Sequence, residues 1–173
     1  MADNFHHALG TGAANAAAGD HTHTGQQNFY PHDAGRSNVN ASAAASHYGD
    51  YVSGIFNDGA KGYSFYTGYF AAAPASVKVA VIPLGTGDLA WYTTSVFAGS
   101  GETYTTNTDA QGSDGTPQTT AVVADKMTEI DVTDSFTGAA TGDYFGLQFV
   151  RDGNDAADTV GATVHILGVR VTY

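Results

Sequence analysis

The sequence of 173 residues contains no cysteine, so neither a disulfide framework nor a thiolate metal site is possible. Its stability must therefore come from packing, to which oligomerisation can add. Positive charge is also scarce, because six Lys and Arg residues stand against 17 Asp and Glu residues and the net charge is −11. Since no basic patch exists for phosphate contacts, we expect no nucleic-acid partner.

Charged side chains of either sign make up only 13% of the chain, and small or hydroxyl-bearing residues take the place of the usual Lys and Glu surface. A surface of this kind is suited to burial against other chains. No apolar run approaches the ~18 residues needed to span a bilayer. Residues 1–18 also lack the basic start and hydrophobic centre of a signal peptide. We therefore expect synthesis in a cytoplasm, without membrane insertion and without secretion by that route.

Residues 1–50 differ in kind from the rest of the chain, because a few apolar residues are scattered there among small and polar ones. Such a segment cannot bury enough apolar surface to offset its own ordering entropy. We predict that residues 1–50 form an extended N-terminal arm used in assembly or anchoring, and that residues 51–173 form one β-sandwich domain.

The body of the chain alternates between short apolar or aromatic runs and turns rich in glycine and polar residues. About eight such runs at roughly ten-residue spacing are typical of a sandwich or barrel. We predict an all-β fold, an antiparallel, jelly-roll-like β-sandwich of about eight strands. The expected strands are residues 62–70, 77–82, 89–97, 102–106, 119–124, 128–132, 143–150 and 159–172.

The last two runs flank a loop of Gly, Asn and Asp, a pattern typical of a β-hairpin. The final run is apolar on both alternating faces, with Val160, Ala162, Val164 and Ile166 on one and His165, Leu167, Val169 and Val171 on the other. A strand that is apolar on both sides needs cover on both sides. We therefore expect residues 163–171 to be a central strand of the sandwich or a strand at a subunit contact.

Histidine is concentrated in the arm, which holds six of the seven residues of this type. In an extended backbone, His21 and His23 would point to the same side. Three copies around a threefold axis would supply six nitrogen ligands, an octahedral shell suited to iron or another transition metal, whereas one chain with a carboxylate would give a zinc-like site. The alternative is two solvated histidines in a flexible arm.

Residues 151–158 hold three carboxylates within a loop. Asp152, Asn154 and Asp158 are candidate calcium ligands, but their spacing differs from the EF-hand pattern and the closing Glu is missing. The sequence favours an acidic turn in which Asp and Asn side chains bond to neighbouring backbone amides.

Catalytic and ligand-binding patterns are weak. The G-x-S-x-G motif is absent, and His165 within an apolar strand indicates a core or interface histidine, so we expect no enzymatic activity. Trp91 and Tyr92, together with the aromatic run at residues 63–70, are candidates for a platform on which a sugar stacks. Aromatic alternation in strands is more often core and cross-strand packing.

Two long stretches, residues 77–104 and 131–173, carry a family likeness, and most of it lies in G-D-Y-F-G-L-Q-F-V-R-D-G-N-D-A-A-D-T-V at residues 142–160. Over roughly residues 60–173 the chain resembles the β-sandwich module of tailed-phage tail-fibre, head-fibre and capsid-decoration proteins. The resemblance implies a homotrimer on a threefold axis. It also implies that His21 and His23 match the His-x-His metal sites found on the axis of some tailed-phage fibres.

Together, these patterns predict a non-enzymatic virion structural protein of a tailed phage, made in the host cytoplasm. It would be a homotrimeric knob anchored by its arm to capsid or tail, as a head fibre, decoration or short tail-fibre protein. The alternative is a receptor- or glycan-binding, lectin-like adsorption module. It would bind a host surface glycan through Trp91, Tyr92 and the loops at residues 99–115 and 151–158.

Overall fold

A computed structural model describes residues 26–29, 44–48, 51–105 and 107–173. Within these residues the chain forms eleven strands and one short 3-10 helix, and every strand pairing is antiparallel. The prediction of an all-β fold is confirmed. The elements are β1 (Gln26–Phe29), β2 (Ala44–Tyr48), β3 (Tyr51–Phe56), β4 (Lys61–Tyr69), β5 (Ser76–Pro83), β6 (Gly87–Ala98), β7 (Asn107–Gln111), β8 (Gln118–Val122), β9 (Thr128–Asp131), η1 (Thr133–Phe136), β10 (Tyr144–Asp152) and β11 (Val164–Thr172).

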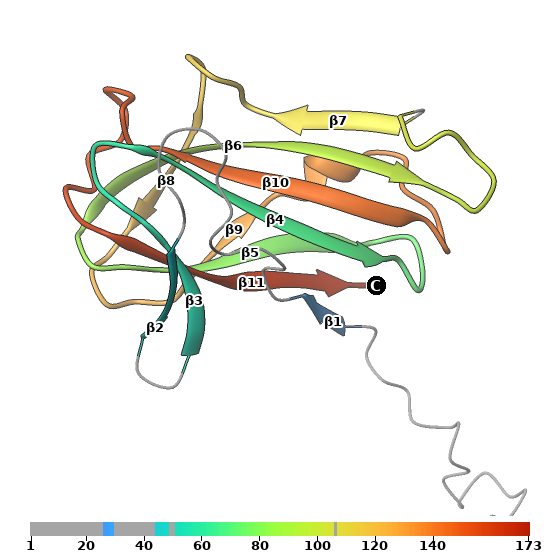
Figure 1. Cartoon of the computed structure of the whole chain (residues 1–173), viewed down its shortest axis with the longest axis horizontal. Helices are drawn as coiled ribbons and strands as arrows, with labels where there is room; N and C mark the ends of the chain where they lie inside the picture. The colour runs from blue at the N-terminus through green and yellow to red at the C-terminus, as the bar shows by residue number, and fades with distance from the viewer. Residues whose placement is uncertain (1–25, 30–43, 49–50, 106) are drawn as a thin grey trace, which may run out of the picture.

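The strands form two sheets. Sheet A has the order β2-β3-β11-β5-β9, with β1 also pairing with β11, and sheet B has the order β4-β10-β6-β7, with β8 also pairing with β6. Eight of these strands pair as the two arms of one long hairpin, β3 with β11, β4 with β10, β5 with β9 and β6 with β8. Rolling up this hairpin places successive strands in different sheets, which is the jelly-roll arrangement (Figure 1). The predicted jelly-roll-like sandwich of about eight strands is confirmed, with β1, β2 and β7 added to it.

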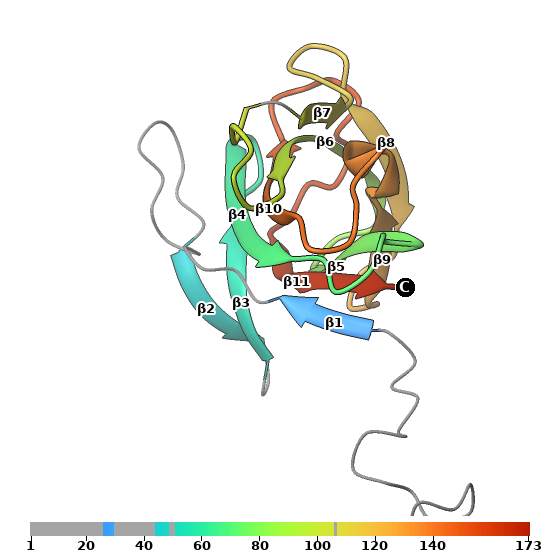
Figure 2. The ribbon, with the colours of Figure 1, turned by 90° about the vertical axis from the view of Figure 1, so that its right-hand side faces the viewer.

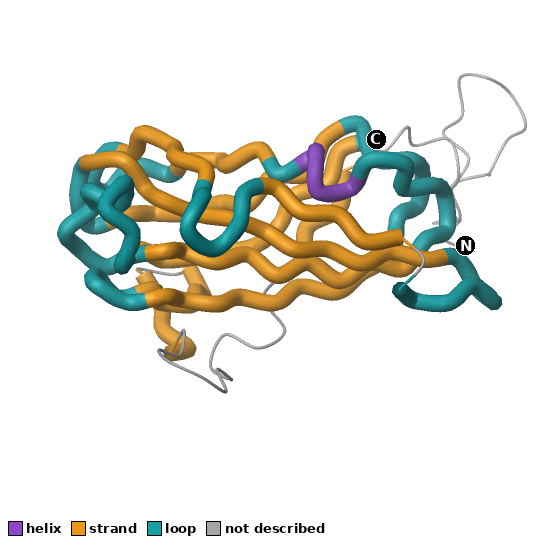
Figure 3. Tube along the Cα trace, turned by 90° about the horizontal axis from the view of Figure 1, so that it is seen from above, coloured by secondary structure: helices purple, strands orange, loops and turns teal. Residues whose placement is uncertain are grey.

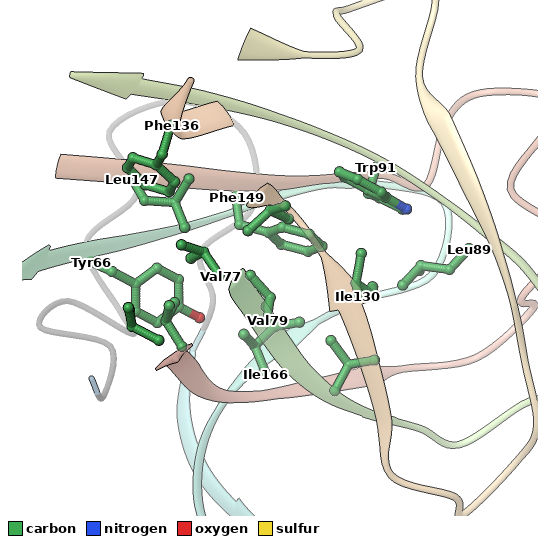
Figure 4. Packing of buried hydrophobic residues seen from close by; sticks show 14 of the residues in the cluster. Tyr66, Val77, Val79, Leu89, Trp91, Ile130, Phe136, Leu147, Phe149 and Ile166 are labelled. Carbon is green, nitrogen blue, oxygen red and sulfur yellow. The ribbon is translucent and has the colours of Figure 1, made fainter. Parts of the chain in front are cut away.

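The core lies between the two sheets and results from period-two alternation along the strands. Val77, Val79 and Val81 of β5 point inward from sheet A, and Leu147 and Phe149 of β10 point inward from sheet B, as Figure 4 shows for most of them. Aromatic rings fill much of the space between the sheets. The turns gather at the two ends of the sandwich (Figure 3).

The last two strands are not a hairpin, which corrects the expectation from sequence. Strand β10 lies in sheet B between β4 and β6, whereas β11 lies in sheet A next to β5. Residues 153–163 therefore cross from one sheet to the other. The two runs have the local look of a hairpin, but each finds its hydrogen-bonding partners in strands that are distant in sequence.

Strand β11 is the central strand of sheet A, as predicted, but its faces are divided differently. The pairing with β5 shifts register between Ile166 and Gly168, which indicates a β-bulge. The extra residue turns Val169 and Val171 into the core, so that they join Ile166 there. His165 points to the other side of sheet A, where it too is buried.

Two strand predictions in the body need correction. Residues 51–56 form β3, which the sequence analysis missed, and residues 102–106 form no strand among those described. Glu102 closes a turn instead, because its amide donates to the carbonyl of Gly99 at 3.2 Å and its carboxylate accepts the Gly99 amide at 2.9 Å. The chain resumes pairing with β6 only at Asn107, opposite Phe97.

Two segments of the predicted arm are strands of sheet A. Strand β1 pairs with β11 in the register Gln26 to Thr172, and β2 pairs with β3 in the register Tyr48 to Tyr51. In the end-on view of Figure 2, β1 and β2 lie outside the closed part of the sandwich, beside β11 and β3. No described strand from residues 1–50 joins sheet B.

Candidate binding face on sheet B

The outer face of sheet B is formed by the side chains of β4, β10, β6 and β7 that alternate with the core-facing ones. Register brings these side chains into rows across the strands. Tyr69 lies opposite Tyr144 between β4 and β10, and Gln148 lies between Phe65 on β4 and Thr94 on β6. Residues from four separate strands therefore share one surface.

Aromatic side chains are unusually exposed on this face. Phe65 is 40% exposed, Tyr69 50% and Tyr144 66%. The rings of Tyr69 and Tyr144 lie with their centroids 6.4 Å apart. Large aromatic groups gathered on one exposed surface are typical of an interaction site.

A groove of about 720 Å³ crosses the middle of this face. Its lining includes the outward side chains Phe65, Thr67, Thr94, Val96, Thr108, Ala110 and Gln148. Gly146 lies at its centre on β10, flanked by Thr67 on β4 and Val96 on β6. A Cβ atom added to Gly146 would lie 3.3 Å from Cγ2 of Val96, so the missing side chain keeps the floor of the groove open.

The groove is mainly apolar, with a few uncharged polar groups and almost no charge. The hydroxyl of Thr94 donates to Oε1 of Gln148 at 3.1 Å. Of the twelve lining residues, all of them in the described part of the chain, only Asp109 is charged. Its carboxylate accepts the backbone amides of Ala110 at 2.8 Å and Thr137 at 3.3 Å. The groove thus offers hydroxyl and amide groups beside an aromatic wall, and no cation.

The two aromatic residues singled out from the sequence are not part of the groove lining. Trp91 is only 3% exposed, stacks on Phe149 with ring centroids 5.7 Å apart, and donates its indole N–H to the hydroxyl of Thr120 at 2.9 Å. It therefore offers no face to a ligand, and the core-packing interpretation holds for it. Tyr92 is also buried, outside the groove lining, and burial raises the pKa of its hydroxyl.

An ion-pair cluster lies at one end of the β4 and β10 pairing. Lys61 bonds to the carboxylate of Asp114, and its Nζ lies 3.3 Å from Oδ2 of Asp152. The bond to Asp114, supported by Asp152, raises the pKa of Lys61 well above its usual range. A lysine held in the charged form has no lone pair to offer, so Lys61 is neither a nucleophile nor a base here.

The acidic loop contains a buried ion pair. Arg151 and Asp158 have side chains that are 0% and 1% exposed, and they form two hydrogen bonds, from Nε at 2.9 Å and from one terminal nitrogen at 2.8 Å. The remaining N–H groups of Arg151 donate to backbone carbonyls, those of Phe56, Val160 and Ala162. All five donors of the guanidinium are thereby satisfied.

This ion pair decides between the alternatives for residues 151–158. Asp158 binds a guanidinium, and both Asp155 and Asp158 accept backbone amides two residues further along the chain. The turn interpretation is confirmed, and no group of three or more His, Cys, Asp or Glu side chains suited to a metal is found among the described residues. Sequence analysis missed Arg151, because a cation next to several acidic residues in a loop gives no sign of burial.

A serine and a histidine meet within sheet A. Ser53 of β3 shares a hydrogen bond of 2.9 Å with Nδ1 of His165 on β11. Ser53 is completely buried and His165 is 6% exposed, and burial lowers the pKa of the imidazole. Because no substrate can reach the serine hydroxyl, this pair is a structural link between two strands, as the sequence predicts for His165.

The remaining predicted residues, His21 and His23, lie outside the described residues. No helix in the described part of the chain is long and apolar enough to cross a membrane. Comparison of the sequence with protein-family models gives no match, and comparison with curated proteins gives none either.

Proposed function

We propose that this chain is a non-enzymatic structural protein of a tailed-phage virion, a homotrimeric knob attached through its N-terminal segment to capsid or tail. The observation that carries the proposal is a structural difference between the two sheets. Both described strands from residues 1–50 join sheet A, while sheet B keeps an open outer face. A chain built in this way has one side for attachment and one side for presentation.

Composition supports self-association independently. A surface poor in charged side chains suits contacts with other copies or with other virion proteins. His21 and His23 fit this arrangement, since three copies would bring six imidazoles to a common axis, enough for iron or another transition metal. A zinc-like site within one chain is the alternative for these two residues.

The native mass of the purified full-length chain, with elemental analysis before and after a strong chelator, tests this proposal. We expect a species of three times the 17.8 kDa chain mass. Release of about one metal per three chains together with dissociation would make the His21 and His23 pair the clasp of the trimer. A trimer that resists the chelator and contains no metal would leave the knob in place without a metal site. A stable monomer with a sharp melting transition would refute the trimeric knob.

A further inference from the structure

We propose that the groove on the outer face of sheet B binds a neutral oligosaccharide, so that the knob has an adsorption site in addition to its structural role. The proposal goes beyond assembly and names residues different from the predicted Trp91 and Tyr92. It depends on three properties of the groove: its aromatic wall, its uncharged polar groups and its length.

The wall of the groove provides the stacking surface. Phe65 is 40% exposed at the edge of the lining, although it is a phenylalanine with no polar atom to draw it toward water. The flat apolar face of a pyranose ring is the kind of surface that an exposed aromatic ring covers, and aromatic contacts contribute beyond the area they bury. Sugar hydroxyls at the edge of the same ring would then reach the neighbouring polar groups.

Those polar groups are of the right chemistry. Thr67, Thr94 and Thr108 line the groove from three different strands, and Gln148 on β10 lies opposite Thr94. Hydroxyl groups donate and accept, and the carboxamide does both at separate atoms, which matches the mixed donors and acceptors of a sugar. A purely apolar partner would bury these groups without partners, at a cost in free energy.

Charge selects neutral sugars over acidic ones. The groove contains no Lys, Arg or His among its described lining residues, and its one carboxylate, on Asp109, already accepts two backbone amides. The chain as a whole carries a net charge of −11. A uronic or sialic acid would therefore enter a negative field and find no cation to pair with it.

The length of the groove favours a short chain of sugars over a single one. Its lining residues come from β4, β10, β6 and β7, which are neighbours in that order. Four strands at the usual spacing extend over roughly 14 Å. Gly146 lies in the middle of this path, so a ligand crossing the strands meets no side chain there.

The test is a methyl-NMR titration of the full-length protein with a panel of neutral hexasaccharides of α- and β-linked glucose, mannose, galactose and N-acetylglucosamine, with hexagalacturonate as the acidic comparator. We expect saturable shifts of the Val96 methyl groups with at least one neutral sugar and none with hexagalacturonate. The methyl group of Ile82, on the outer face of sheet A, serves as the remote reference.

Two variants locate the site. Phe65→Ala removes the stacking surface and should weaken binding up to about tenfold. Gly146→Val fills the floor without removing any contact group, and it should abolish the sugar-induced shifts of Val96. Met127→Ala is the matched control, because Met127 is a similarly exposed apolar residue that is not part of the groove. Melting curves of each variant verify the fold.

The proposal is overturned if the whole neutral panel leaves Val96 unshifted, if hexagalacturonate binds equally well, or if Gly146→Val binds like the unaltered chain. It is also overturned if Phe65→Ala lowers the native mass, because the groove would then be a contact between copies. These results are independent of the structural role. A trimer that binds no sugar would refute only the adsorption site. A monomer that binds sugar would refute only the trimeric knob.

Discussion

Both sheets carry large apolar or aromatic side chains on their outer faces, but several of those on sheet B are exposed, whereas several of those on sheet A are buried. On sheet A, Ile82, His165 and Leu167 point away from the core and are nevertheless buried, and the N-terminal strands pair with the same sheet. On sheet B, Phe65 and Tyr144 point away from the core and are exposed beside a groove. The comparison shows that an apolar residue on the outer face of a sheet can be either buried or exposed, and that alternation along its strand does not tell which.

The largest effect is expected from removing Arg151, whose hydrogen bonds join the two sheets. Arg151 lies on β10 of sheet B and donates to carbonyls of residues that precede or end strands of sheet A, including Phe56 and Ala162. Arg151→Met leaves the carboxylate of Asp158 buried without its partner. We expect the free energy of unfolding to fall by about 3–5 kcal/mol, measured by urea denaturation.

A double variant provides the control for this prediction. Arg151→Met combined with Asp158→Leu removes both charges, so it should recover a substantial part of the lost stability. If Arg151→Met alone costs less than about 1 kcal/mol, the value typical of a surface pair, the pair does not hold the crossing segment 153–163 in place.

A matched pair of outer-face substitutions sharpens the comparison directly. Leu167→Ala on sheet A removes a buried side chain and should lower the free energy of unfolding by about 2 kcal/mol. Tyr144→Ala on sheet B removes an exposed side chain and should change it by no more than about 0.5 kcal/mol. Thermal melting of both variants provides the measurement. Equal losses would show that the outer face of sheet B also contributes to folding.

The smallest expected effect is a pH dependence confined to sheet A. Burial lowers the pKa of His165 below its usual value of 6.5, so folding favours the neutral ring. Its contribution to stability is therefore complete above pH 6.5 and is lost as the pH falls through 6.5 toward the folded pKa, with a slope of at most about 1.4 kcal/mol per pH unit.

Urea denaturation at pH 7.5 and 5.5 measures this slope, because both values lie above the range in which most carboxylates titrate. His165→Gln keeps a polar group near Ser53 and removes the titration. The difference in slope between the unaltered chain and the variant gives the effect of His165 alone, because both chains keep the six histidines of residues 1–50. An unchanged slope in the variant would show that His165 does not sense pH.

The sequence predicts the fold class because period-two alternation is a local property. The valines of β5 and the aromatic residues of β10 reveal a two-sheet core without any knowledge of their partners. Strand pairing is not local, and for that reason β10 and β11 resemble a hairpin in sequence. The bulge near Gly168 is equally hidden, because one unpaired residue reverses which side of a strand faces the core.

The candidate site is less visible in the sequence than the fold. Trp91 stands out by residue type but lies in the core, while Gly146 is inconspicuous and forms the floor of the groove. The alternation of Phe65 with Tyr66 and of Thr94 with Ser95 could identify outward-facing residues on each strand. What it could not give is the register that brings four strands to one surface.

The pairing of β11 also determines when sheet A can form during synthesis of the chain. This strand forms hydrogen bonds with β1, β3 and β5, all of which leave the ribosome before it. Sheet A therefore lacks its central strand until β11 has been synthesised. Contacts between residues so far apart in sequence place the protein among slow-folding domains, with expected times of milliseconds to seconds. Until then β5 and the N-terminal strands present unpaired edges, so expression at low temperature or with abundant chaperones should favour soluble protein.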